Sequence, residues 1–385
     1  MNVRKVMARG LLNLESLEIG SGSLVNVREF EIDVGSVVRW SYVIRDSVIV
    51  DLIPYVVSDL VIADNCCNEV NFTCLDLSRF VNLRSIRIGS NCLNHVRSVL
   101  TEGLIHLESL IVGERSLMNA GEIEMSNSVD IEWVYEANDM MSVVNAPSVI
   151  SKLMIGDNCC NEVNFTSLDL SRFVHLKSLV IGKNSLNEIV NITGVEYELL
   201  NEVIIGENSL SSLSHSYTVN NRNTLLSIPW DVTVLTVAAS SCNEDTITVV
   251  DLSSFKFLRS IVIGNSCFGY VLAFSIVGLN WLESVSIGYR SFGSHGSLWE
   301  GSHFKIVDCP QLKSLSIGYY SFGRYNWFEL SELPQLKSVV MTSNTDYGCF
   351  QYARNAVFRD LPSLETIDLG YHVFRNAEYV VFESM

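Results

Sequence analysis

Ten cysteines are the residues of this 385-residue sequence that could most directly do chemistry. Cysteine thiolates bind zinc, usually as pairs separated by two residues, and they also form disulfides. The adjacent pairs Cys66-Cys67 and Cys159-Cys160 lack that separation. Seven cysteines recur at equivalent positions of an internal repeat, and they are Cys66, Cys67, Cys92, Cys159, Cys160, Cys242 and Cys267. Other copies have Ser, Leu or Phe there, which favours small buried core residues over a metal site or disulfides.

The other reactive side chains form no recognisable catalytic pattern. The histidines, among them His95, His175, His215 and His372, are scattered without the spacing of metal ligands. The sequence has no glycine-rich phosphate loop after a strand and no nucleophile elbow, and no acidic pair recurs at one repeat position. We therefore expect a protein that is not an enzyme and that uses no cofactor and no metal. An enzymatic alternative would need a site inserted between repeats.

Three N-glycosylation sequons begin at Asn71, Asn164 and Asn191. The first two lie in duplicated segments and therefore count as one signal. The opening residues of the sequence have no long apolar run of the signal-peptide type. Chance and duplication therefore explain the sequons better than glycosylation does.

One eleven-residue phrase recurs along the chain, and this phrase indicates the elements that position all these residues. Residues 83–93 read LRSIRIGSNCL and residues 176–186 read LKSLVIGKNSL. We number its positions one to eleven. Most neighbouring copies are 24 to 32 residues apart, a spacing typical of repeat proteins. The seventh positions of thirteen recognisable copies are Gly20, Ala63, Gly89, Gly113, Gly156, Gly182, Gly206, Ala238, Gly264, Gly288, Gly318, Thr342 and Gly370.

A longer period is superimposed on the short one. Residues 63–94 match residues 156–187 at 24 of 32 positions, so a unit of three repeats was duplicated. Two gaps of 43 residues follow Gly20 and Gly113. They place longer insertions near residues 25–55 and 118–147, and each insertion holds either a decayed repeat or a long loop.

Each copy predicts a β-strand with one buried face. Positions four and six are apolar, as in Leu179 and Ile181, and position five lies between them. Because each strand returns one repeat later in the same direction, the sheet must be parallel. Return segments such as residues 75–80 are too short for a full helix, so we expect a short second strand followed by a helical turn. All six prolines lie just ahead of a strand, where a missing N–H is tolerated.

The positions after the strand predict a tight turn. Glycine at position seven suits a backbone turn where a side chain would be costly. Asparagine at position nine is expected to bond to the turn backbone and to stack copy upon copy. Six copies have this residue, which is found at Asn65, Asn91, Asn158, Asn184, Asn208 and Asn344.

The repeated pattern L-x-x-L-x-L-x-x-N-x-L, in phase over residues 14–374, resembles the leucine-rich-repeat family. Late copies end in Ser-Phe, as at residues 291–292 and 321–322, which resembles the BspA-like branch. The resemblance implies one β-rich repeat solenoid over residues 1–385, shaped like a horseshoe. Its concave face would carry the parallel sheet, and its convex face short strands and helical turns. Such architectures more often present a binding surface than a catalytic site.

Composition narrows the range of partners. The chain has 43 acidic and 26 basic side chains and a net charge of −17, so nucleic acid or an anionic membrane surface is not expected as the main partner. No apolar stretch is long and uncharged enough to span a bilayer, and we expect no membrane insertion. Cysteines interpreted as reduced favour an intracellular location, although the compartment stays open.

The exposed positions change along the chain from polar to aromatic. Tyrosine and arginine are residues that anchor protein interfaces. We therefore expect a protein partner to bind the concave sheet face in the late copies, and stacking between repeats is the alternative explanation. The late residues at positions eight and nine, which we call the aromatic ridge, are Tyr289, Arg290, Tyr319, Tyr320, Tyr371 and His372.

Two further expectations concern the array as a whole. A cell-surface or secreted adhesin or antigen fragment built from the same repeats is the alternative to a protein-binding scaffold. Neither end of the sequence shows a polar capping repeat, and an uncapped solenoid end exposes strand edges. We therefore expect either a truncated array or end-to-end self-association.

Overall fold

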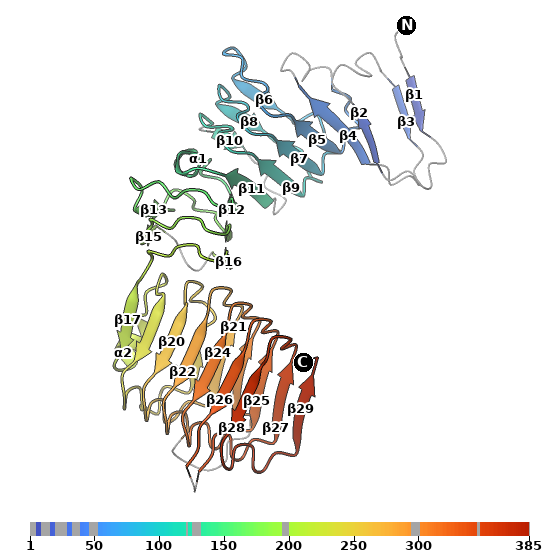
Figure 1. The fold of residues 1–385 in the computed structure, drawn as a ribbon. Coiled ribbons are helices and arrows are strands. Elements are labelled where there is room, and N and C mark those ends of the chain that lie inside the picture. The colour runs from blue at the N-terminus through green and yellow to red at the C-terminus, as the bar shows by residue number, and fades with distance from the viewer. Residues whose placement is uncertain are drawn as a thin grey trace. The chain divides into compact units, whose positions relative to one another are not determined.

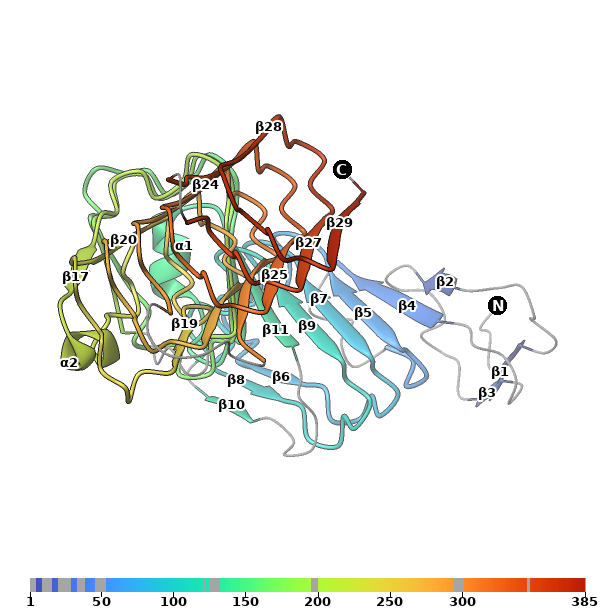
Figure 2. The same ribbon diagram turned by 90° about the horizontal axis from the view of Figure 1, so that it is seen from below.

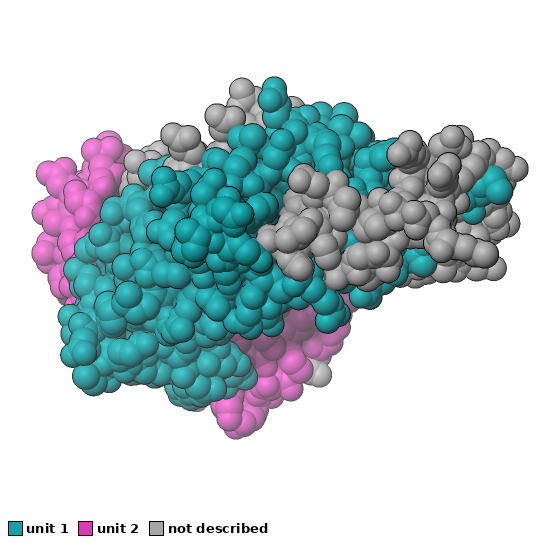
Figure 3. All heavy atoms as spheres, turned by 90° about the horizontal axis from the view of Figure 1, so that it is seen from above, with its two compact units in different colours: residues 1–202, 206–211 teal, residues 203–205, 212–385 magenta. Residues whose placement is uncertain are grey.

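The computed structural model describes residues 5–8, 16–19, 29–32, 39–45, 53–120, 122–124, 132–194, 200–293, 301–344 and 347–384. The chain divides into two compact units (Figure 3). The first unit comprises residues 1–202 and 206–211, and the second unit comprises residues 203–205 and 212–385. Each unit is described by itself, and the expectation of one solenoid over residues 1–385 stays a prediction.

The chain contains two kinds of strand (Figure 1). Main strands cover repeat positions three to six, and return strands lie in the segments between them. A parallel sheet of nine main strands contains β2 (Ser16–Ile19), β4 (Arg39–Ile44), β5 (Asp59–Ile62), β7 (Ser85–Ile88), β9 (Ser109–Val112), β11 (Glu132–Ala137), β12 (Lys152–Ile155), β14 (Ser178–Ile181) and β16 (Glu202–Ile205). The return strands of the first unit are β1 (Lys5–Ala8), β3 (Glu29–Ile32), β6 (Cys74–Asp76), β8 (Ser98–Leu100), β10 (Glu122–Glu124), β13 (Ser167–Asp169) and β15 (Asn191–Thr193).

The second unit contains one sheet of each kind, and its strands follow one another in register (Figure 2). The seven-stranded sheet has the main strands β17 (Ser216–Val219), β18 (Val234–Val237), β20 (Ser260–Ile263), β22 (Ser284–Ile287), β24 (Ser314–Ile317), β26 (Ser338–Met341) and β28 (Thr366–Leu369). The six-stranded sheet has the return strands β19 (Val249–Asp251), β21 (Ala273–Val277), β23 (His303–Val307), β25 (Trp327–Ser331), β27 (Asn355–Arg359) and β29 (Tyr379–Glu383).

The register predicted for the main strands is confirmed. In β14 the side chains of Leu179 and Ile181 are buried, and in β24 those of Leu315 and Ile317 are buried. All strand pairings among the described residues are parallel, and the main strands other than β4 and β11 pair at equal repeat positions, as in Leu315 beside Val339. A parallel β-rich repeat solenoid is therefore the architecture, and period-two patterning at a fixed spacing was sufficient to predict it.

Helix is nearly absent among the described residues. It is limited to α1 (Met140–Asn145) and α2 (Arg222–Leu226). Asn221 caps α2, since its side chain accepts a hydrogen bond from the Thr224 N–H at 3.1 Å. Elsewhere the return strands are followed by hydrogen-bonded turns rather than by helical turns, as where the N–H of Phe80 donates to the carbonyl of Leu77. Within the described part of the chain, no helix is long and apolar enough to cross a membrane.

Both 43-residue gaps contain a further main strand. Strand β4 lies in the first gap and pairs with β2 and β5, and β11 lies in the second and pairs with β9 and β12. The two strands are equivalent, because the Trp40 and Trp133 N–H groups donate to Ser58 Oγ and Ser151 Oγ, each at 2.8 Å. The same bond, from the N–H of His215 to Thr233 Oγ1, ties β17 to β18.

The repeating unit therefore contains four main strands rather than the three that the sequence showed. The fourth strand has lost the phrase's leucines and its glycine, but it keeps the alternation of buried residues. In β11, for example, Trp133 and Tyr135 are buried. Pairing on both sides decides that β4 and β11 are strands, since their local patterns are weak.

Most turns after a main strand contain two left-handed residues, at positions nine and eleven, whereas the described residues after β11, β17 and β26 do not show this pair. Examples are Asn91 (φ 55°) and Leu93 (φ 57°) in the first unit, and Tyr320 (φ 59°) and Phe322 (φ 55°) in the second. Asparagine tolerates this conformation, which explains its frequency at position nine. Position eleven is apolar and buried, so burial offsets the backbone cost there.

Glycine at position seven is required by close approach of the backbones and not by its dihedral angles. A Cβ on Gly113 would lie 2.8 Å from the Gly89 carbonyl carbon, and one on Gly206 would lie 2.5 Å from that of Gly182. Real Cβ atoms do not come so near to another backbone. The repeats therefore stack most tightly at this corner.

Candidate functional site

The cysteines at position ten belong to a hydrogen-bonded ladder that serines continue. The Cys92 thiol donates to the Ala63 carbonyl at 3.0 Å, and the Ser116 hydroxyl donates to the Gly89 carbonyl at 2.7 Å. Ser116 Oγ also accepts the N–H of Cys92 at 2.8 Å. Thiol and hydroxyl thus make the same bonds to the preceding repeat, which explains why the two residues replace each other.

All ten cysteines are free thiols. Of the seven repeat cysteines, five are buried, whereas Cys66 and Cys159 are only half-buried. Burial raises the pKa of Cys309 and of Cys349 to about 12 each, so both thiols stay protonated at neutral pH. In the described ranges, no group of three or more His, Cys, Asp or Glu side chains is placed to hold a metal ion. Cys349 occupies position ten, but the sequence analysis missed it because the turn before it is longer.

One pair of thiols is in direct contact. The sulfur atoms of Cys159 and Cys160 lie 3.4 Å apart. This contact and burial raise the pKa of Cys160. Cys159 Sγ contacts the Gly156 carbonyl of its own repeat at 3.1 Å, so this thiol does not make the bond that Cys92 makes to the preceding repeat. The N–H of Cys159 does join the ladder, since it donates to Ser185 Oγ at 3.3 Å.

Two sets of asparagines connect neighbouring repeats. At position nine, Asn91 Nδ2 donates to Asn65 Oδ1 at 2.9 Å, so these side chains bond to each other rather than to the turn backbone as expected. The bond to the backbone comes from a second set at position twelve, where Asn68 Oδ1 accepts the N–H of Asn94 at 3.0 Å. The sequence signal for this second set was its recurrence one residue beyond the phrase.

Part of the aromatic ridge is assembled as stacked rings. The Tyr289 and Tyr319 rings lie 5.0 Å apart between centroids and 4° from parallel. They belong to neighbouring repeats, whose main strands β22 and β24 are paired. Tyr289 is 38% exposed and Tyr319 is half-buried. Both functions, stacking between repeats and presentation of a surface, are therefore compatible with this pair.

The position-nine residues of the ridge lie on the left-handed corner. Arg290, Tyr320 and His372 have φ values of 56°, 59° and 61°. The Tyr320 ring contacts Tyr347, with 4.5 Å between centroids. Sequence reasoning missed Tyr347, because it lies in the lengthened turn after β26, outside the phrase. In the described residues, Arg290 makes no salt bridge with a carboxylate.

Tyr371 is the most exposed of the ridge tyrosines, at 73%. Its N–H donates to the Ser343 hydroxyl at 2.5 Å, and Ser343 occupies position eight of the intervening repeat. The described ring contacts do not join Tyr371 to the Tyr289–Tyr319 stack. The ridge therefore consists of a stacked pair, a corner cluster and a separate outer tyrosine.

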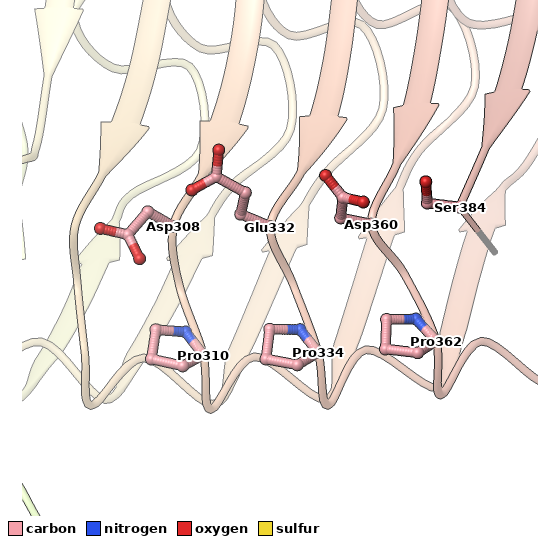
Figure 4. Close-up of a pocket in the computed structure, with 7 residues that line it drawn as sticks. All are labelled: Asp308, Pro310, Glu332, Pro334, Asp360, Pro362 and Ser384. Carbon is pink, nitrogen blue, oxygen red and sulfur yellow. The ribbon is translucent and has the colours of Figure 1, made fainter.

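A groove on another side of the second unit is lined by two rows of residues (Figure 4). Its volume is about 490 Å³. One row consists of the residues that follow the return strands, and three of these are carboxylates in the left-handed conformation. The other row consists of the prolines two residues further on. The lining residues are Asp308, Pro310, Glu332, Pro334, Asp360, Pro362 and Ser384.

The remaining residues of interest are dispersed. His95 and His175 lie in separate repeats, and His215 contacts Asp231, with 3.0 Å between Nδ1 and Oδ1. The sequon residues Asn71 and Asn164 are exposed in turns. Compared with known proteins, the sequence matches no protein-family model and no curated protein.

Proposed function

We propose that this chain is a non-enzymatic scaffold that binds another protein through the aromatic ridge, on the main-sheet side of the second unit. The observation that carries this proposal is the partly exposed stack of Tyr289 and Tyr319. Two tyrosines already held ring against ring lose little conformational freedom when a partner covers them. The ridge is thus preorganised for binding.

The chemistry of the ridge supports a protein partner. Tyrosine offers a large apolar ring with a polar hydroxyl, and Arg290 can pair with a carboxylate or stack on a ring. Tyr371 has the largest exposed fraction of the ridge tyrosines, so its ring is open to a partner. The same main sheet carries a row of hydroxyls at position three, in which Ser260 Oγ and Ser284 Oγ lie 3.0 Å apart.

We further propose that the chain is a diverged leucine-rich-repeat protein of the BspA-like kind. Support comes from the leucine-rich phrase, from asparagine at position nine and from the Ser-Phe ends of the late copies. Ser291 and Ser321 bond to the preceding repeat, and Phe292 and Phe322 stack at 4.4 Å, so this dipeptide has a structural role in the two turns that contain it.

A cell-surface or secreted adhesin is the second candidate. The observation that favours it is the exposure of Asn71 and Asn164, since both sequons occupy turns that a glycosylation enzyme could reach. Ten free thiols favour the intracellular scaffold instead, because disulfides are the rule in oxidising compartments.

The ridge is tested by photocrosslinking followed by affinity measurement. A benzophenone amino acid at Tyr371 should capture a protein partner from a lysate of the native cell, and the same group at Tyr352 should not. Tyr352 is the matched control, because it is an exposed tyrosine of the same unit, at 42%. The partner's affinity for the Tyr289→Ser, Tyr319→Ser and Tyr371→Ser triple variant is then compared with its affinity for the wild type.

We expect the triple variant to lose about 2 kcal/mol or more of binding free energy, and Tyr352→Ser to change affinity little. Circular dichroism shows whether the variants remain folded. Unchanged affinity in a folded triple variant would assign the tyrosines to stacking alone, and the binding face would then lie elsewhere. Release of glycans by an N-glycosidase from native protein would instead favour the secreted candidate.

A further inference from the structure

The adjacent thiols of Cys159 and Cys160 differ from the other thiols of the position-ten ladder. Their sulfur atoms are in contact at 3.4 Å. In the duplicated copy, Cys66 Sγ contacts the Arg45 carbonyl oxygen of the preceding main strand at 3.4 Å. Cys159 Sγ instead lies 4.0 Å from the carbonyl oxygen of Ala137, at the end of the preceding main strand. The Cys159 thiol is therefore held only weakly by that strand and lies against its neighbour in the sequence.

The two thiols also differ in access and in proton affinity. Cys159 is half-buried and Cys160 is buried, so Cys159 is the thiol of this pair that a reagent from solvent reaches. A hydrogen bond from the Cys160 thiol lowers the pKa of Cys159, and the same bond raises the pKa of Cys160. Cys159 is therefore the first of the two to lose its proton, and the thiolate is the form that reacts with oxidants.

We propose that Cys159 and Cys160 are an oxidisable dithiol, which a hydroperoxide converts into a disulfide between adjacent residues. In the first step the Cys159 thiolate attacks one peroxide oxygen and the O–O bond breaks. Cys159 becomes a sulfenic acid, and the alkoxide leaves and takes up the proton that Cys159 had released.

In the second step the Cys160 sulfur attacks the Cys159 sulfur. The S–O bond breaks, the S–S bond forms, and hydroxide leaves as water with the Cys160 proton. The hydrogen bond to the Cys159 thiolate is the main cause of the raised pKa of Cys160, and the first step removes it. Two thiols and one hydroperoxide thus give one disulfide, one alcohol and one water, and the two electrons lost by sulfur reduce the peroxide.

The disulfide formed in this way should be easily reduced. Adjacent Cα atoms are about 3.8 Å apart, which is less than the spacing of about 4.4–6.8 Å that is usual for disulfides. The bond therefore closes a strained ring, and strained disulfides are the labile ones. We expect an excess of a small thiol to restore both cysteines.

The chain contains matched controls for this dithiol. The second unit has Ser241 and Cys242 at the same two repeat positions, so Cys159→Ser reproduces a pair that the protein already contains. Cys74 is an exposed thiol and serves as the control for access alone.

Peptide mass spectrometry tests the proposal on the full chain, treated with one equivalent of hydrogen peroxide and then alkylated. We expect the Cys159-Cys160 peptide to lose two hydrogens and to resist alkylation until a reductant is added. Its oxidation should be on the order of tenfold faster than that of Cys74 or of the Cys66-Cys67 peptide. Cys160→Ala should leave a sulfenic acid at Cys159 that dimedone traps, and Cys159→Ser should leave Cys160 open to alkylation in the unfolded chain.

Three results would overturn the proposal. The first is oxidation of Cys74 or Cys66 ahead of Cys159, because the contact would then confer no reactivity. The second is a disulfide between two chains, seen as a dimer under non-reducing conditions. The third is a sulfinic acid at Cys159 beside an intact Cys160 thiol. Circular dichroism checks the fold of each variant, and Cys159→Ser keeps the test decisive if Cys160→Ala does not fold.

Discussion

The interiors of the two units are built from different residues on the same backbone. At position eleven the first unit has aliphatic or thiol side chains such as Leu93, Leu186 and Cys160, and all three are buried. The second unit has Cys242 at this position in its first such turn and phenylalanine in the later turns, where successive rings stack with centroids 4.4 to 5.7 Å apart. The phenylalanines of this row are Phe268, Phe292, Phe322, Phe350 and Phe374.

The length of the return strands explains why phenylalanines in the second unit replace the smaller side chains of the first. The return strands β6, β8, β13 and β15 have three residues, whereas β21, β23, β25, β27 and β29 have five. Longer return strands enclose more volume in each turn, and a second phenylalanine row at Phe274, Phe304 and Phe328 fills it. The corner itself stays constant, since Leu186 and Phe322 have φ values of 57° and 55°. The cross-section can therefore change while register and turns are kept.

Truncation of a side chain at position eleven should cause the largest loss of stability, and the loss should differ between the two interiors. Phe322→Ala should destabilise the second unit by about 3–5 kcal/mol, because the ring contacts Phe292, Phe304 and Phe350. Leu186→Ala should cost the first unit about 2–5 kcal/mol, and less than Phe322→Ala does. Both positions share the left-handed backbone, so its contribution cancels. Denaturant titration measures the losses, and Val163→Ala, at 73% exposure, is the control. A larger loss at Leu186 would refute the comparison of the interiors.

Both units contain the serine ladder at position ten. Removing one of its hydroxyls should cause a loss of stability of intermediate size, and the loss should be equal in the two units. Ser185 and Ser321 are buried, and their hydroxyls donate to the Gly156 and Gly288 carbonyls at 2.7 and 2.8 Å. Replacing either serine by Ala leaves a carbonyl unpaired and should cost about 1–3 kcal/mol. Serine-to-Cys substitution keeps a donor, as the natural cysteines of this ladder do, and should cost less. Equal losses for Ala and Cys would show that thiol and hydroxyl are not interchangeable here.

The smallest effect is expected at the surface. Lys183 pairs with Glu207 at 3.6 Å in the first unit, and Lys313 pairs with Glu283 at 3.3 Å in the second. Both lysines are more than half exposed, at 61% and 51%. Lys183→Ala and Lys313→Ala should each cost less than about 0.5 kcal/mol, and salt should reduce the cost further. A loss above about 1 kcal/mol in one unit only would mean that the units also differ at their surfaces.

The candidate site was predictable only in part. Tyr289 and Tyr319 could be placed together from the sequence, because equal repeat positions lie side by side in a parallel sheet. The contact of Tyr320 with Tyr347 could not be placed, since Tyr347 belongs to a lengthened turn that breaks the count. The separation of Tyr371 from the stacked pair followed from the small Ser343 in between, and the sequence had already shown this residue.

The sequence by itself determined the strands, their parallel direction and the burial of positions four and six. These features depend on the alternation of apolar residues within each strand and on the regular spacing of the repeats. Both can be read from short stretches of the sequence. The exchange of Ser for Cys at position ten likewise predicted core residues, although two of the cysteines are only half-buried.

Only the tertiary structure decided that β4, β11 and β17 are main strands, that asparagines bond across repeats at two positions, and that the interior changes from aliphatic to aromatic packing. Each of these features depends on a neighbour about one repeat away. Trp133, for example, is fixed by a hydrogen bond to Ser151 and by pairing of its strand on both sides. A weak local pattern becomes a strand when both neighbours supply hydrogen bonds, and that energy is absent from any single stretch of sequence.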